Sequence, residues 1–248
     1  MTRTAAVVGA AGGVGATRLT VETGAALARA GHDVALLDAA WGTQGLARHV
    51  TGRVAPDLTD LLVADRPLAD GLRDHDGAAG APGRLAICAA HAPFERVASA
   101  KARDVARGLG ERLDAAVDGA FDYALVDTPP VAANQAVAAV AAADRVLAVT
   151  APTERGVDAL QGTRARLADL GADLDAVVQN RVADDATPDA DLTVPDAGLP
   201  PAGETPATLV TGHPVGPAAA AVAEAAVETS LDLDFEQGLV DAARRRLG

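Results

Sequence analysis

The chain has 248 residues and a formal net charge of −13, because 34 aspartate and glutamate residues outnumber 21 lysine and arginine residues. This length allows one large α/β domain or two small domains, with a substantial core. The acidic balance excludes strong non-specific binding to nucleic acid, whose phosphates repel it. No run comes near the ~20 consecutive apolar residues of a membrane-spanning helix, and a glycine at position 9 ends the first apolar run.

The acidic and basic residues are each biased toward one type. Aspartate outnumbers glutamate by 26 to 8, and Lys101 is the only lysine. Short carboxylates keep a protein hydrated when salt screens charge repulsion, and long lysine stems are avoided, as in extreme halophiles. Cys88 has no partner cysteine, which is typical of a reducing compartment. We therefore expect a cytoplasmic protein of a halophile.

Short apolar runs alternate along the chain with alanine-rich segments of helical character. After a first strand at 5–8, the expected strands are 34–38, 85–90, 123–127, 145–150, 176–180 and 207–212. The expected helices are 15–30, 95–118, 131–142, 156–170 and 216–229. Such alternation is the pattern of βαβ units around a parallel sheet. The stretches 73–84 and 183–207, rich in Gly, Pro and Asp, are expected to be surface loops. The fold class is α/β.

The first expected strand leads into a glycine-rich loop, VVGAAGGVGATRLT, at residues 7–20. Gly9, Gly13 and Gly15 match the glycine spacing of short-chain dehydrogenases, and Asp38 stands where a ribose-binding acid belongs. Those enzymes also need a tyrosine and a lysine four residues apart, and the single tyrosine and single lysine of this chain are not so placed. A Rossmann-type dinucleotide-binding protein thus stays an alternative, but the catalytic tyrosine–lysine pair of these dehydrogenases is absent from the sequence.

The same loop also aligns with the Walker A pattern GxxxxGK[ST], at residues 10–17. In this alignment Thr17 provides the metal-binding hydroxyl, whereas Ala16 stands where the lysine belongs. Successive backbone N–H groups and the start of the following helix can still hold phosphates.

A later segment decides between the two alignments. FDYALVDTPP, at 121–130, reads as a buried strand that ends in Asp127, the form of a Walker B strand. With this segment the chain resembles the MinD/ParA family of P-loop ATPases, whose Walker A loops are deviant. The resemblance continues in order through the segments GGVGAT, GHDVALLDAAWGTQGL, FDYALVDTPP, ADRVLAVTAPTERGVDAL, VVQNR and VTGHPVGPAAAAVAEAA.

The resemblance implies a three-layer sandwich with a mostly parallel sheet of about seven strands, and a site for ATP or ADP with Mg²⁺. It implies Thr17 and Asp127 as magnesium ligands and Asp38 as a residual catalytic carboxylate. Asn180 takes the position that contacts adenine. The implied nucleotide-binding residues are Gly12, Gly13, Val14, Gly15, Ala16, Thr17, Arg18, Asn180 and Arg181.

Three charged positions of the family are alanine here. Ala11 replaces the lysine that reaches a partner's nucleotide across a dimer, Ala16 replaces the Walker A lysine, and Ala40 replaces the second aspartate of a DxD pair. Such groups stabilise transition-state charge or orient water. We therefore predict a pseudo-ATPase that acts as a regulatory or positioning partner of another protein. The alternative is a slow or partner-stimulated ATPase in which Arg18 or a partner's residue supplies the charge.

The sequence divides into a MinD/ParA-like domain at 1–230 and a C-terminal helical tail at 231–248. Resemblance to MinD suggests a peripheral membrane contact through this tail, but packing on the domain is the favoured interpretation. The family also implies a homodimer, which the loss of a lysine at Ala11 weakens.

Overall fold

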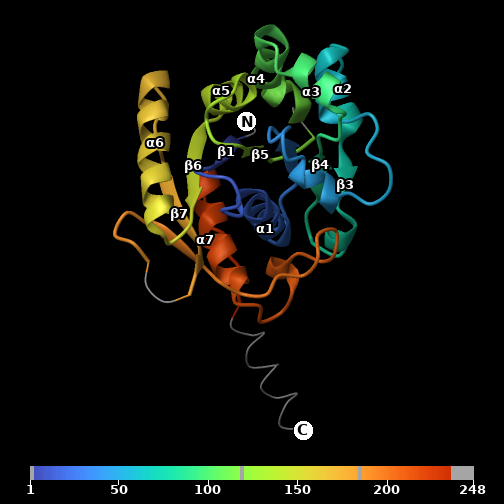
Figure 1. Ribbon diagram of the computed structural model, residues 1–248. Helices are drawn as coiled ribbons and strands as arrows, with labels where there is room; N and C mark the ends of the chain where they lie inside the picture. Colours follow the sequence, from blue (N-terminus) through green and yellow to red (C-terminus); the bar gives the residue numbers. More distant parts are fainter. Residues whose placement is uncertain (1–2, 118–119, 184–185, 236–248) are drawn as a thin grey trace, which may run out of the picture.

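A computed structural model describes residues 3–117, 120–183 and 186–235 of the chain (Figure 1). The strands are β1 Arg3–Gly9, β2 Val34–Asp38, β3 Arg73–Asp74, β4 Leu85–Cys88, β5 Tyr123–Thr128, β6 Arg145–Thr150, β7 Ala176–Val182 and β8 Leu192–Pro195. The α-helices are α1 Ala16–Arg29, α2 Leu58–Val63, α3 Phe94–Ala100, α4 Arg103–Val117, α5 Asn134–Ala142, α6 Glu154–Leu170 and α7 Val215–Val227. The 3₁₀ helices are η1 Gly45–His49, η2 Leu68–Gly71, η3 Asp76–Ala78 and η4 Ala207–Leu209.

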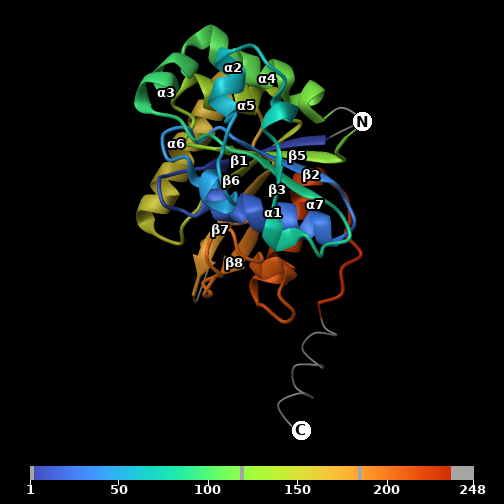
Figure 2. The ribbon, with the colours of Figure 1, turned by 90° about the vertical axis from the view of Figure 1, so that its right-hand side faces the viewer.

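The described strands form one sheet in the order β3-β4-β2-β5-β1-β6-β7-β8. Neighbouring strands are parallel, except that β3 runs antiparallel to β4. Helices α1 and α7 cover one face, and α2 to α6 lie on the other side (Figures 1 and 2). The expected α/β fold with three layers is confirmed, and the sheet has eight strands rather than about seven.

Burial on both faces explains why the central strands read as unbroken apolar runs. All five residues of β2 are buried. Leu36 belongs to the core beneath α1 and α7, whereas the next residue, Leu37, belongs to the core beneath α2 and α4. Successive side chains of a strand point to opposite faces, so a strand between two helical layers needs apolar residues at every position.

The expected strand at 207–212 is wrong. This segment forms η4 and a turn, and its backbone N–H groups do not join the sheet. The N–H groups of Ala207 and Thr208 donate instead to the buried carboxylate of Glu22, at 3.0 and 2.8 Å. The last strand comes from within the expected loop 183–207, where β8 pairs with β7.

Two further expectations need correction. The helix expected at 95–118 is two helices, α3 and α4, separated at Lys101 and Ala102. The expected surface loop 73–84 contains the short edge strand β3 and the helix η3. Neither difference changes the order of the layers.

The C-terminal tail lies mostly outside the described residues, which end at 235. The part that is described packs on the domain, since the Arg29 guanidinium lies 4.4 Å from the centre of the Phe235 ring. The division at residue 230 and a membrane contact stay predictions. Among the described residues, no helix is both long enough and apolar enough to cross a bilayer.

Helix α1 packs so closely on the sheet that Gly24 has no room for a side chain. A Cβ at this position would lie 2.8 Å from a Leu85 methyl group and 2.9 Å from a Leu36 methyl group. We expect Gly24→Ala to lower the free energy of unfolding by about 1–3 kcal/mol, because overpacking displaces core side chains. Urea denaturation would measure this loss.

Gly162, in the middle of α6, provides the matched control. The nearest atom to a Cβ at this position would be 3.8 Å away, on Arg166. Gly162→Ala should therefore stabilise the protein by about 0.5–1 kcal/mol, as expected for a helical glycine without steric conflict. Equal effects of the two substitutions would contradict the close approach of α1 to the sheet.

Candidate functional site

The glycine loop connects β1 to α1 at the carboxyl end of the sheet. Gly13 and Gly15 have φ angles of 80° and 87°, in the left-handed region that glycine adopts without strain. Gly15 is the N-cap residue of α1 and makes no side-chain capping bond. The first N–H groups of a helix have no intrahelical partner, so this end of α1 is suited to an anion.

A cavity of about 480 Å³ lies against this loop, within the size range of small-molecule sites. The cavity is formed by the glycine loop, the start of α1, the segment after β2, the end of β5, Arg181 of β7 and Ala202 after β8. Its lining residues are Gly9, Ala11, Gly12, Gly13, Val14, Gly15, Ala16, Thr17, Arg18, Ala40, Thr43, Gly45, Arg48, His49, Asp127, Thr128, Pro129, Pro130, Arg181 and Ala202.

The three alanines at positions where the resemblance implies charged residues all line this cavity. Ala11 and Ala16 come from the loop and the first residue of α1, and Ala40 follows β2. Residues with long charged side chains at these positions would therefore extend toward the same space. The structure places methyl groups at the three positions where the MinD/ParA resemblance implies two ammonium groups and a carboxylate.

Asp127 and Thr17 form the part of the cavity that could hold a divalent cation. Asp127 is buried, and its Oδ2 atom has no hydrogen-bond partner in the described part of the chain. Burial raises the pKa of Asp127 to about 6, and a polar contact with the Thr17 hydroxyl opposes this rise. An unpaired buried carboxylate oxygen beside a hydroxyl fits the oxygen ligands that Mg²⁺ takes.

Asp38 lies beside Asp127 on the neighbouring strand, since the two residues pair in the register of β2 and β5. Its Oδ1 accepts a hydrogen bond from the Ala40 N–H at 2.9 Å, and its Oδ2 accepts one from the Ala90 N–H at 3.3 Å. Burial and the Asp127 carboxylate raise the pKa of Asp38 well above its ordinary value. Asp38 is not among the residues that line the cavity, so its catalytic role stays a prediction.

Arg18 borders the cavity, but its guanidinium is bound elsewhere. It donates to the Glu22 carboxylate through Nε at 2.8 Å and Nη2 at 2.6 Å, and to the Pro200 carbonyl through Nη1 at 2.7 Å. Glu22 itself is 1% exposed. Use of Arg18 as a substitute cation would require breaking a buried ion pair, which is costly.

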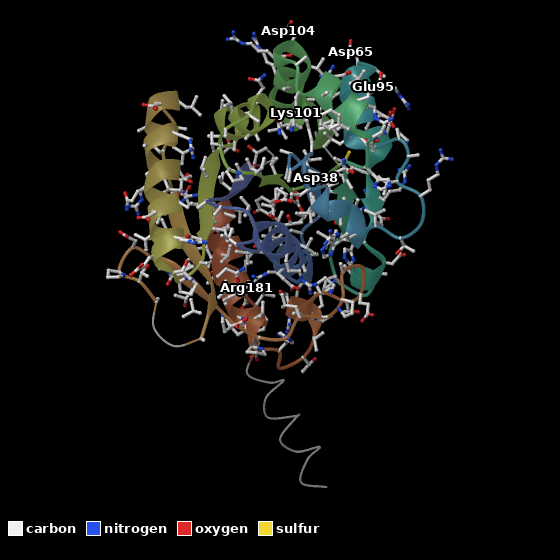
Figure 3. The ribbon with its side chains drawn as sticks, in the orientation of Figure 1. Asp38, Asp65, Glu95, Lys101, Asp104 and Arg181 are labelled. Carbon is white, nitrogen blue, oxygen red and sulfur yellow. The ribbon has the colours of Figure 1, made fainter. Side chains whose placement is uncertain are left out.

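Asn180 and Arg181 hold the glycine loop from the end of β7. The Asn180 Nδ2 donates to the Val14 carbonyl at 2.9 Å, and an Arg181 guanidinium nitrogen donates to the Gly13 carbonyl at 3.2 Å. Figure 3 shows Arg181 on the opposite side of α1 from Asp38. Both residues therefore lie beside the loop, and their contacts with nucleotide stay predictions.

Sequence reasoning missed Arg48 and His49, which η1 brings to the cavity. They lie ten or more residues after Asp38, in a segment without a recognisable motif. Only the return of the chain after β2, where Gly45 packs against Thr17, places them there. No spacing in the sequence signals this return.

His49 is buried, and its ring centre lies 6.0 Å from that of His75, another buried imidazole. Burial, and then the charges of Arg18, His75 and Arg48, lower the pKa of His49 to about 4, against an opposing effect of Glu22. The imidazole is therefore neutral in the folded protein near neutral pH.

We expect the His49 imidazole to make folding less favourable as the pH falls from about 6.5 to about 4, because only the unfolded chain gains the proton in this range. When the pH is lowered from 7 to 5, the free energy of unfolding should fall in both proteins. The fall should be about 1–2 kcal/mol smaller in His49→Gln than in the wild type. Urea denaturation at both pH values tests this. Between pH 7 and pH 8 the difference between the two proteins should stay constant, and an identical pH dependence at pH 5 would reject the assignment.

The parallel sheet, the glycine loop at the start of α1, and the Thr17–Asp127 pair define a P-loop nucleotide-binding fold. A model of the AAA domain family matches residues 2–173, more than half of the chain. The chain belongs to this family.

Several solved structures are similar to this chain in fold. The MinC:MinD cell division protein complex of Aquifex aeolicus matches with a TM-score of 0.70 and 22% identity, over 94% of this chain and 98% of that chain. The Mg-ADP complex of the septum site-determining protein MinD from Pyrococcus horikoshii matches with a TM-score of 0.66 and 22% identity, over 79% and 82%. Cobyrinic acid a,c-diamide synthase from Mycobacterium smegmatis, with ADP and magnesium, matches with a TM-score of 0.60 and 21% identity, over 73% and 75%. A comparison with curated proteins finds no match.

Proposed function

We propose that this protein is a pseudo-ATPase of the MinD/ParA group, which binds a nucleotide with Mg²⁺ and regulates or positions a protein partner. The observation that carries the proposal is the lining of the cavity, where the glycine loop and Asp127 persist while Ala11, Ala16 and Ala40 replace the charged groups. Backbone N–H groups and a helix N-terminus bind phosphate in the ground state. Hydrolysis also needs charges that act on the transition state.

Thr17 and Asp127 are the residues that would hold Mg²⁺. The fit rests on the unpaired Oδ2 atom of Asp127 and on the two adjacent buried carboxylates, Asp38 and Asp127, whose pKa values are both raised. A cation next to this pair favours the ionised forms. When bound, Mg²⁺ neutralises phosphate charge, and the protein contributes the two oxygen ligands.

Several related structures support the nucleotide and the partner. The Pyrococcus horikoshii MinD carries Mg-ADP, the Mycobacterium smegmatis synthase carries ADP and magnesium, and the Aquifex aeolicus MinD is in a complex with MinC. By analogy we propose that this chain binds ATP or ADP, forms a homodimer and contacts another protein. Family membership favours a triphosphate over a dinucleotide as the ligand.

The proposal predicts that the wild type binds MgATP without turning it over. A variant with Ala11→Lys, Ala16→Lys and Ala40→Asp should gain hydrolysis, because each restored group is worth about 10²–10³ in rate. Calorimetric titration with ATP, ADP and NAD⁺ gives the affinities, and release of inorganic phosphate in high KCl gives the rates.

The matched control is Ala11→Met, Ala16→Met and Ala40→Asn, which adds side chains of similar size without charge. It should remain inactive. Fast hydrolysis by the wild type would overturn the pseudo-ATPase proposal, and tight binding of NAD⁺ with no binding of ATP would favour the dinucleotide alternative. An Arg18→Ala variant tests the alternative of a slow or partner-stimulated ATPase. A partner-stimulated rate of hydrolysis that falls in this variant would support that alternative.

A further inference from the structure

A phosphate chain in this cavity needs positive charge that the loop no longer supplies. Polyphosphates carry several negative charges, and guanidinium groups bind them through paired, charge-assisted hydrogen bonds. The cavity is lined by four basic side chains, which are Arg18, Arg48, His49 and Arg181. Only a side chain that is charged and not already bound to other groups can bind phosphate.

Three of the four have other roles in the structure. The Arg18 guanidinium is bound to Glu22 and to the Pro200 carbonyl. His49 is buried next to His75 and uncharged near neutral pH. Arg181 donates one hydrogen bond to the Gly13 carbonyl and so holds the loop.

Arg48 is exposed, and its guanidinium makes no hydrogen bond or ion pair with the residues that the structure describes. It lies on η1, which is held close to the phosphate loop. A Cβ at Gly45, the first residue of η1, would lie 2.8 Å from the Thr17 Cγ2 atom. The glycine thus lets η1 approach the residue proposed to bind metal, and Arg48 follows three positions later. The backbone of Arg48 is thereby held at the edge of the cavity, which the Arg48 side chain lines.

We infer that Arg48 binds the phosphate chain of the ligand, in place of the lysines that Ala11 and Ala16 replace. This inference rests on the proposed function, and it adds the residue that supplies the positive charge. A guanidinium can bind two phosphate oxygens at once. The charge comes from outside the P-loop, on an element that the Walker motifs do not include.

The ligand class is a polyphosphate chain with Mg²⁺. The space beside Asn180, where the family resemblance places adenine, has a volume of only about 40 Å³. This is room for a water molecule or two and far below the ~300 Å³ of a typical ligand site. Asn180 is also bound to the loop, through the Val14 carbonyl. Recognition is therefore concentrated on the phosphates, which a nucleoside triphosphate or inorganic tripolyphosphate can provide.

The test compares Arg48→Ala with Arg53→Ala, in the full chain and at constant ionic strength. Both substitutions remove one exposed arginine, but Arg53 does not line the cavity. Calorimetry with MgATP and with magnesium tripolyphosphate should show a loss of about ten- to hundredfold for Arg48→Ala, as for a lost hydrogen bond to a charged group. Arg53→Ala should bind as the wild type does. Thermal unfolding establishes that all variants are folded.

A second variant shows whether Arg48 acts on the phosphate chain itself. Adding Ala16→Lys to Arg48→Ala restores a cation to the cavity from a different element, and it should recover most of the lost affinity. A purely structural role of Arg48 would not be rescued in this way. Similar losses for ATP and tripolyphosphate support recognition through phosphate, whereas binding of ATP alone would show that the base is read and would reject the ligand class.

The outcomes separate the two proposals. Binding of MgATP that Arg48→Ala leaves unchanged would overturn the role of Arg48 and leave the proposed function standing. Absence of any binding by the wild type, to either ligand, would overturn both.

Discussion

The hydrogen bonds of the buried Glu22 carboxylate join parts of this molecule that are far apart in the sequence. It accepts hydrogen bonds from the N–H groups of Ala207 and Thr208, from the Thr208 hydroxyl and from the Arg18 guanidinium. Burying a charge is costly unless it is paired and hydrogen-bonded, and here the donors come from α1 itself and from η4. One carboxylate therefore joins the helix after the phosphate loop to the segment before α7. The same carboxylate also holds the Arg18 guanidinium.

The sequence predicts the fold well because the fold depends on repeated, local patterns. Strands between two helical layers must be apolar on both faces, and β2 and β5 are recognisable for this reason. Elements held by single long-range bonds are different. The segment 207–212 has the composition of a strand, but its N–H groups bind Glu22, which is 185 residues away for Ala207. Nothing within the segment indicates that Glu22 is its partner. Strand β8 is hard to predict for a similar reason, because it forms by backbone pairing with β7 in a stretch rich in proline and aspartate.

The candidate site divides in the same way. Gly13, Gly15, Thr17 and Asp127 are predictable because the loop and the strand end carry local motifs, and the three alanines follow from alignment with those motifs. Arg48 and His49 were not predictable, since their place in the cavity depends on how the chain returns after β2. The family pattern thus identifies the groups that are missing. Only the three-dimensional structure shows which other basic side chains line the same cavity.

The bonds from Asn180 and Arg181 to the loop carbonyls affect how the protein would respond to the proposed ligand. Two side chains from β7 hold the loop in shape before anything binds, so little conformational entropy remains to be lost on binding. A loop that does not reorganise offers a partner little change of shape to detect. The ligand would then act mainly by stabilising the folded protein, to an extent that rises with the ligand concentration.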